Sequence, residues 1–114
     1  MSWIMVAGPY RAGAAGGEDR ARNLRAMNEA ALAVFAKGHV PVIGVNMALP
    51  MIEAAGAERY DELMMPVSLA LAERCDAILR IGGPSGGADR EVELMRAQGK
   101  PVYSDLTEVP EATT

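Results

Sequence analysis

Residues 76–103 decide the fold of this chain and read DAILRIGGPSGGADREVELMRAQGKPVY. A short apolar run at 77–81 leads into the glycine-rich residues 82–87. Helical spacing then predicts a helix over 88–98, and a new strand starts at 101–103. The order is strand, glycine-rich turn, helix and strand. In open α/β sheets such a turn lies at the carboxyl edge of the strands, where ligands bind.

The rest of the chain continues this alternation of strands and helices. Apolar runs at 3–7 and 39–43 are typical of strands in a parallel sheet. Pro41 places the second strand at an edge, because proline cannot donate a hydrogen bond to a neighbouring strand. The pattern predicts one α/β domain over residues 1–114. Its parallel sheet of about four or five strands is flanked by helices in a three-layer sandwich of the flavodoxin or Rossmann type.

Three further helices are expected, at 18–37, 47–55 and 60–74. Asp19 is a plausible N-cap of the first helix. Pro50 interrupts the second, and Pro66 either kinks the third or sets a new start. The tail from Glu108 to Thr114 is expected to fray.

Composition excludes several classes of function. With 114 residues and 50% hydrophobic residues, the chain suits one packed domain. The formal net charge of -4 predicts no basic surface for nucleic acid. One cysteine and one histidine argue against a structural metal site. We expect no signal peptide and no membrane span, and therefore a cytoplasmic, soluble protein.

Three strand ends bring polar groups to one edge of the predicted sheet. The candidates are Gly8, Pro9 and Tyr10 after the first strand, Asn46 after the second, and Ser85, Gly86, Gly87, Asp89 and Glu91 after the third. Backbone N–H groups at the start of the last helix can bind an anion, and Ser85 adds a hydroxyl. The turn matches neither the phosphate-loop motif nor G-x-G-x-x-G, so we expect no nucleoside triphosphatase, no dinucleotide enzyme and no cofactor.

Glu91 is the most informative of these candidates. It falls in the first turn of the predicted helix, shortly after Ala88. One interpretation is structural: the carboxylate complements the helix dipole or forms a capping box. In the other, the dipole keeps Glu91 ionised beside a substrate, as a nucleophile or a stabiliser of developing positive charge. Asp89 has the same two interpretations and is a natural cap.

Other polar and sulfur-containing residues favour structural roles. His39 is expected at the start of its strand, away from the ligand edge, and Asp76 lies at that same far edge. The methionines Met47, Met51, Met64 and Met65 are expected in the core or at a contact between copies, in preference to a pliable pocket.

Three segments together carry a resemblance to a known family: IMVAGPY at 4–10, ERCDAILRI at 73–81 and SGGADREVELMRAQGKPVY at 85–103. They resemble the nucleoside 2-deoxyribosyltransferase superfamily, including its short, uncharacterised bacterial members. In that family the first strand ends in a Gly-Pro or similar turn followed by an aromatic residue. A glutamate follows a serine or aspartate by six positions, as Glu91 follows Ser85.

The resemblance implies cleavage of an N-glycosidic bond. In the family, the glutamate that matches Glu91 attacks the anomeric carbon and displaces a nucleobase. The glycosyl-enzyme then reacts with another base or with water. Tyr10 would hold that carboxylate, and Ser85 would bind a sugar hydroxyl or a 5′-phosphate. The implied partners are a nucleoside or nucleotide and further copies of the chain, in a homodimer or homotetramer.

One departure from the family pattern affects the chemistry. Active members commonly carry an aspartate at the place that here falls at Ser68. A serine cannot protonate the leaving base as a carboxylic acid does. Either Asp61, Glu62 or a partner chain takes that role, or protonation of the base is absent. Two alternatives remain: a non-catalytic nucleotide-binding module, and a lysine-decarboxylase-like nucleotide phosphoribohydrolase.

Overall fold

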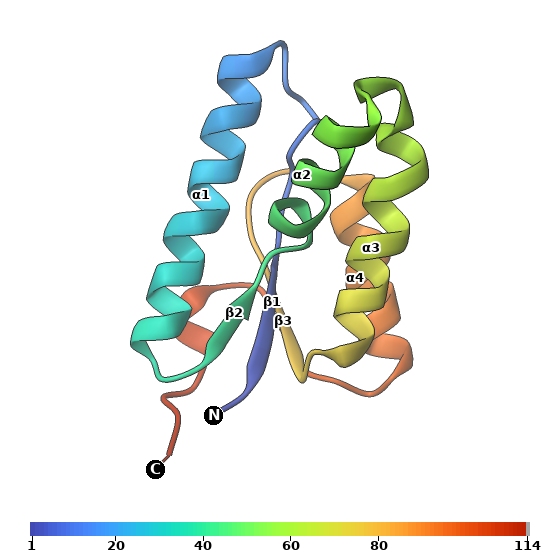
Figure 1. The fold of residues 1–114 in the computed structure, drawn as a ribbon. Helices are drawn as coiled ribbons and strands as arrows, with labels where there is room; N and C mark the ends of the chain where they lie inside the picture. Colours follow the sequence, from blue (N-terminus) through green and yellow to red (C-terminus); the bar gives the residue numbers. More distant parts are fainter. Residues whose placement is uncertain (114) are drawn as a thin grey trace.

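The computed structural model describes residues 1–113 and contains a four-stranded parallel sheet between layers of helices (Figure 1). The strands are β1 (Trp3–Ala7), β2 (Val40–Val42), β3 (Ala77–Arg80) and β4 (Val102–Tyr103), in the spatial order β2-β1-β3-β4. All three strand pairs are parallel. The predicted α/β sandwich is therefore confirmed, and Pro41 lies in the edge strand β2 as expected.

The helices form the outer layers. Helix α1 (Gly17–Ala36) covers one face of the sheet, and α3 (Tyr60–Arg74) and α4 (Gly86–Ala97) cover the other (Figure 1). Residues along each strand contribute alternately to the two faces of the sheet, because successive side chains of a strand point to opposite sides. Ile4, Val6 and Leu79 pack with Met27 and Val34 of α1, while Met5, Ala7 and Ile78 pack with Ala72, Val92 and Met95 of α3 and α4.

The connection between β2 and β3 contains two helices. Helix α2 (Gly44–Ala55) packs against α3 through a small core of Ala48, Ile52 and Met64. The short 3-10 helix η1 (Ala57–Arg59) joins these two helices, and a second one, η2 (Leu106–Glu108), follows β4.

The chain leaves β1 and β3 in opposite directions, which creates the topological switch point of the sheet. From β1 it crosses to β2 at one edge, and from β3 it crosses to β4 at the other. The two carboxyl ends stay side by side, since Ala7 pairs with Arg80 and its carbonyl accepts the Ile81 N–H at 2.8 Å. Open α/β sheets bind ligands in the crevice at this point.

Three helices begin earlier than the sequence pattern predicts, and one of them, α4, begins at Gly86 in place of residue 88. Gly16 is the N-cap of α1, and the Asp19 carboxylate instead accepts the Ala15 N–H at 2.7 Å. Helix α2 begins directly after β2 at Gly44, without the intervening loop that we expected up to Met47. Neither internal proline interrupts its helix, because α2 runs through Pro50 and α3 through Pro66.

The carboxyl-terminal tail is docked, which corrects the expectation of fraying up to residue 113. Val109 is buried, and Lys37 Nζ donates to its carbonyl at 2.7 Å. Ala112 N–H donates to the Lys37 carbonyl at 2.8 Å. Of the predicted tail, only Thr114 lies outside the described residues.

The structural roles predicted for His39 and Asp76 are confirmed. His39 is buried; its Nδ1 accepts the Ser2 N–H at 3.0 Å, so the proton sits on Nε2, 2.7 Å from the Pro110 carbonyl. Asp76 accepts the Trp3 N–H at 2.8 Å. Over residues 1–113, no helix has the length and apolar character needed to cross a membrane.

Candidate active site

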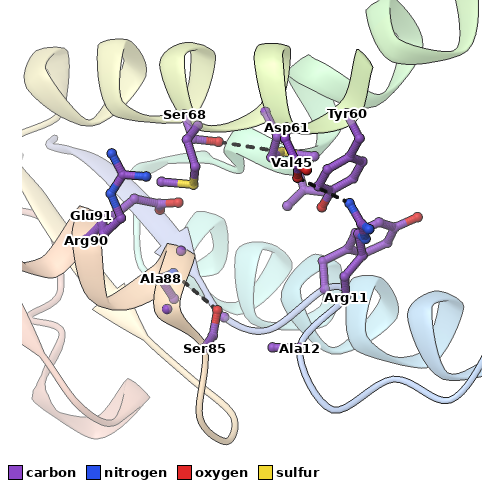
Figure 2. A pocket seen from close by; sticks show the side chains of 16 residues that line it. Arg11, Ala12, Val45, Tyr60, Asp61, Ser68, Ser85, Ala88, Arg90 and Glu91 are labelled. Atoms are coloured by element: carbon purple, nitrogen blue, oxygen red, sulfur yellow. Dashed lines mark hydrogen bonds and ion pairs between the residues drawn. The ribbon is translucent and has the colours of Figure 1, made fainter. Parts of the chain in front are cut away.

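A cavity of about 580 Å³ opens at the switch point (Figure 2). Its walls come from four places: the loop after β1, the start of α2, the part of α3 up to Ser68, and the N-cap and first turns of α4. The residues that line it are Gly8, Tyr10, Arg11, Ala12, Val45, Tyr60, Asp61, Met64, Met65, Ser68, Ser85, Gly86, Gly87, Ala88, Arg90 and Glu91. The cavity thus combines aromatic, apolar and charged side chains around one glutamate.

Glu91 projects from α4 toward the interior of this cavity (Figure 2). The helix begins at Gly86, so Glu91 is its sixth residue and lies in the second turn. This position removes the capping interpretation. Glu91 is 8% exposed, and no side chain within residues 1–113 donates a hydrogen bond to its carboxylate. The carboxylate is therefore buried and available to a ligand.

Burial is the largest influence on the pKa of the Glu91 carboxyl. Loss of solvent raises the pKa of its carboxyl to about 7, while the positive charge of Arg80 acts in the opposite direction. The expectation that the dipole keeps Glu91 fully ionised is not supported, because the dipole acts mainly within the first turn. At neutral pH the site holds a mixture of carboxylate and carboxylic acid, as suits a group that exchanges charge during a reaction.

Arg80 supports the turn from which α4 starts. Its guanidinium donates to the carbonyls of Ile81 and Gly83, the latter at 2.9 Å, and lies 3.3 Å from the Asp89 carboxylate. Its Nε is buried without a hydrogen-bond partner among the described residues. Arg80 therefore joins the end of β3, the glycine-rich turn and α4, and it is the cation that limits the pKa of Glu91.

The amino terminus of α4 faces the same cavity. Ser85 is the N-cap, and its Oγ accepts the Ala88 N–H at 3.2 Å, which leaves the hydroxyl proton available for a ligand. Gly86 and Gly87 line the cavity, and their N–H groups lie in the first turn, where no helical carbonyl can pair with them. This is the frame for an anion or a hydroxyl oxygen that the sequence predicts.

An aromatic and cationic wall lies at the end of the cavity away from Glu91 (Figure 2). The rings of Tyr10 and Tyr60 are parallel within 9°, with centroids 6.5 Å apart. The Arg11 guanidinium carbon is 4.1 Å from the Tyr60 ring centroid, and Arg11 also pairs with Asp61 at 3.6 Å. Burial raises the pKa of the Tyr60 phenol, which keeps it uncharged.

Sequence reasoning missed Tyr60 and Arg11 as parts of the site, although both carried a signal. Arg11 directly follows Tyr10 in the turn after β1. Tyr60 opens α3, which runs back from the ligand edge toward the start of β3 and must therefore begin at that edge. Any helix that returns to the start of a parallel strand places its first turn beside the ligand crevice.

The four methionines have different outcomes, and for Met47 and Met51 the predicted contact between copies stays a prediction. Met64 is buried in the core shared by α2 and α3, but both Met64 and Met65 also line the cavity. Met47 and Met51 are 54% and 42% exposed on α2. The pliable pocket that we ranked second thus has two of the four methionines.

Ser68 stands on α3 where it faces the cavity, and it brings no charge there (Figure 2). It is 1% exposed, and its hydroxyl lies 3.8 Å from the Met64 sulfur. The only carboxylates among the residues that line the cavity are Glu91 and Asp61. The side chain of Asp61 is 95% exposed and paired with Arg11, so it belongs to the mouth of the cavity.

Three predicted ligand contacts lie outside the cavity lining. Asn46 is in the first turn of α2, because that helix starts at Gly44, and its amide donates to the Asn28 side chain at 2.8 Å. Pro9 packs against Gly82. Asp89 pairs with Arg80 on the outer side of α4. Gly8, Tyr10, Ser85, Gly86, Gly87 and Glu91 line the same cavity. No hydrogen bond joins Tyr10 to Glu91 among the described residues, so the holding role that the resemblance implies for Tyr10 stays a prediction.

Fold and cavity define an α/β protein of flavodoxin-like strand order, with a buried glutamate in a ligand cavity at the switch point. Searches for similarity to known protein families and to curated proteins find no match. Within residues 1–113, no cluster of three histidine, cysteine, aspartate or glutamate side chains is arranged to hold a metal ion.

Proposed function

We propose that this protein cleaves the N-glycosidic bond of a nucleoside or nucleotide, with Glu91 as the nucleophile. One observation carries the proposal: a buried carboxylate, without a hydrogen-bond donor among the described side chains, points into a cavity that also contains Tyr10 and Ser85. Carboxylates suit this reaction because its transition state resembles an oxocarbenium ion, which a nearby negative charge stabilises.

In the proposed reaction, a Glu91 oxygen bonds to the anomeric carbon as the bond to the heterocycle breaks. The glycosyl-enzyme ester then passes its sugar to water or to a second base. Ser85 and the N–H groups of Gly86 and Gly87 bind a sugar hydroxyl or a 5′-phosphate. Arg90, which is exposed beside Glu91, adds positive charge for a phosphate. The tyrosine pair provides flat surfaces for the heterocycle.

The test measures, by chromatography, the release of free base from 2′-deoxynucleosides and from their 5′-monophosphates. Wild-type protein is expected to release base above the spontaneous rate, and Glu91→Gln is expected to lose that release. Glu93→Gln is the matched control, because Glu93 lies on the same helix but is exposed to solvent.

A covalent trap identifies the nucleophile directly. A 2′-deoxy-2′-fluoro nucleoside slows hydrolysis of the ester, so a glycosyl adduct is expected on intact-protein mass spectrometry, and its position is found by peptide mapping. An adduct on another residue would refute the assignment of Glu91. Ligand binding without any base release would favour the non-catalytic nucleotide-binding module.

We also propose that copies of the chain associate, as the resemblance implies. Several large apolar side chains are more than half exposed, namely Trp3, Leu32, Phe35 and Met47. Their burial between copies would remove apolar surface from water. Sedimentation equilibrium of the wild-type protein and of a Leu32→Ser, Phe35→Ser variant tests this, with a shift toward monomer expected in the variant.

A further inference from the structure

Cleavage of an ordinary, neutral nucleoside requires two functions from an active site. A nucleophile must attack the sugar, and an acid must protonate the departing nitrogen, because a heterocyclic anion is a poor leaving group. Glu91 acts as the nucleophile in its ionised form, and in that form it has no proton to give to the leaving nitrogen. The other carboxylate in the lining, Asp61, is 95% exposed and paired with Arg11 at the mouth.

The wall of the cavity opposite α4 does not supply the missing acid. There, Ser68 is 1% exposed and packed against Met64. The neighbouring side chains on the inner face of α3 are Met64 and Met65. The interior around Glu91 is thus apolar on this side, with a hydroxyl as its only polar group. A serine hydroxyl does not act as a strong acid toward a leaving heterocycle.

We propose, on the basis of the function proposed above, that the site acts on N-glycosides whose leaving heterocycle already carries a positive charge, such as N-ribosyl pyridinium compounds or N-alkylated purine nucleosides. Such a heterocycle departs as a neutral molecule and needs no proton. One carboxylate inside the cavity is then sufficient for cleavage of the N-glycosidic bond, because no acid is required.

Within the cavity, the Glu91 carboxylate is the charge that favours such a substrate, whereas Arg11 and Arg90 suit an anionic group such as a 5′-phosphate. The Glu91 carboxylate attracts a cationic substrate, and this attraction is stronger in a desolvated site than in water. The tyrosine wall already accepts a planar cation, since the Arg11 guanidinium lies 4.1 Å from the Tyr60 ring centroid. Tyrosine faces attract delocalised cations through their quadrupole, and Tyr10 supplies a second ring parallel to that of Tyr60.

The reaction balances without an additional reagent. An electron pair of a Glu91 oxygen forms the bond to the anomeric carbon. The electron pair of the broken C–N bond stays on the nitrogen and cancels its positive charge. Water then attacks the anomeric carbon, the ester C–O bond returns its electrons to Glu91, and one proton is released. The products are a free sugar hydroxyl, a neutral heterocycle and a proton.

Matched substrate pairs test the inference. 7-Methylguanosine is compared with guanosine, and 7-methyl-2′-deoxyguanosine with 2′-deoxyguanosine; N-ribosylnicotinamide is a second cationic probe. Because the cationic compounds also react faster in water, each enzymatic rate is divided by the spontaneous rate measured in the same buffer. Glu91→Gln protein is measured in parallel.

The expected result is acceleration of the cationic member of a pair only, with loss of that acceleration in Glu91→Gln. Equal acceleration of the neutral and cationic members would overturn the charged-substrate inference and leave the proposed N-glycosidase function standing. Absence of acceleration with every substrate, including the neutral deoxynucleotides, would overturn both.

Ser68→Asp gives a second, independent test. This substitution adds a carboxyl group on the wall opposite α4. It is expected to increase the rate of guanine release from the neutral nucleoside by roughly 10²-fold. Ser68→Asn is the control of equal size without an acid. Thermal unfolding verifies that both variants are folded. Equal activity of folded Asp and Asn variants on the neutral nucleoside would contradict the view that a missing acid limits the site.

Discussion

Gly44 and Ser68 touch across the joint between α2 and α3. A Cβ atom added to Gly44 would lie 2.3 Å from Ser68 Oγ and 2.8 Å from Ser68 Cβ. Only a residue without a side chain fits at the start of α2, and this contact sets the position of the cavity wall that carries Ser68.

Gly44→Ala is therefore expected to destabilise the protein, by about 1–3 kcal/mol, because α2 must move away from α3. Urea unfolding measures the free energy of unfolding. Gly83→Ala is the control, since a Cβ there meets no atom within 4 Å. Equal stability of the two variants would show that α2 shifts without cost.

The raised pKa of Glu91 predicts how stability depends on pH. In the folded state the pKa of Glu91 is raised to about 7, whereas the pKa of an unperturbed glutamate is 4.5. The folded state therefore binds more protons in this range, and the stabilisation that is present below pH 4.5 is lost as the pH rises through 7. The loss is on the order of 3 kcal/mol for this buried group.

Comparison of wild type with Glu91→Gln isolates this effect, because all other titrating groups are shared. The difference between their free energies of unfolding is expected to change between pH 4.5 and 8, in favour of the variant at high pH. A difference that stays constant over this range would show that the pKa of Glu91 is not raised. The proposed activity has the opposite slope: it increases with pH through about 7, as the nucleophile ionises.

Arg80→Met is expected to affect both the turn and the nucleophile. The change removes the donors to the Ile81 and Gly83 carbonyls, with a cost of roughly 1–3 kcal/mol in stability. Loss of the positive charge also raises the pKa of Glu91 further, so the midpoint of the pH–activity curve moves to higher pH. Arg96→Met, which removes an exposed positive charge from α4, the helix that carries Glu91, is the control. An unmoved midpoint in Arg80→Met would contradict the electrostatic coupling.

His39→Ala separates a structural histidine from a catalytic one. It removes the hydrogen bonds to Ser2 and Pro110, which join the two termini to β2, and is expected to cost about 2 kcal/mol of stability. Base release per folded molecule is expected to remain at the wild-type level, because His39 lies at the opposite end of the strand from the cavity. Loss of activity in a folded variant would return His39 to the list of candidate catalytic residues.

The sequence was sufficient for the order of the elements and for most of one wall of the site. Apolar runs and helical spacing predict β1, β3 and α4, and the glycine-rich turn predicts where Ser85 and Glu91 meet. Local signals of this kind depend on residues close in the chain. The start of α2 at Gly44 was not predicted, and neither was the close contact of Gly44 with Ser68, because these two residues are distant in sequence.

Sequence alone thus determined the alternation of strands and helices, the parallel sheet and the candidacy of Glu91, since these follow from periodicity and turn chemistry. Only the tertiary structure decided the environment of that carboxylate. It showed burial in place of capping, Arg80 as the nearby cation, and a wall of Tyr10, Tyr60 and Arg11. The physical reason is that desolvation and charge–charge interactions depend on atoms that folding brings together from separate elements, and residues 76–103 provide only one side of that cavity.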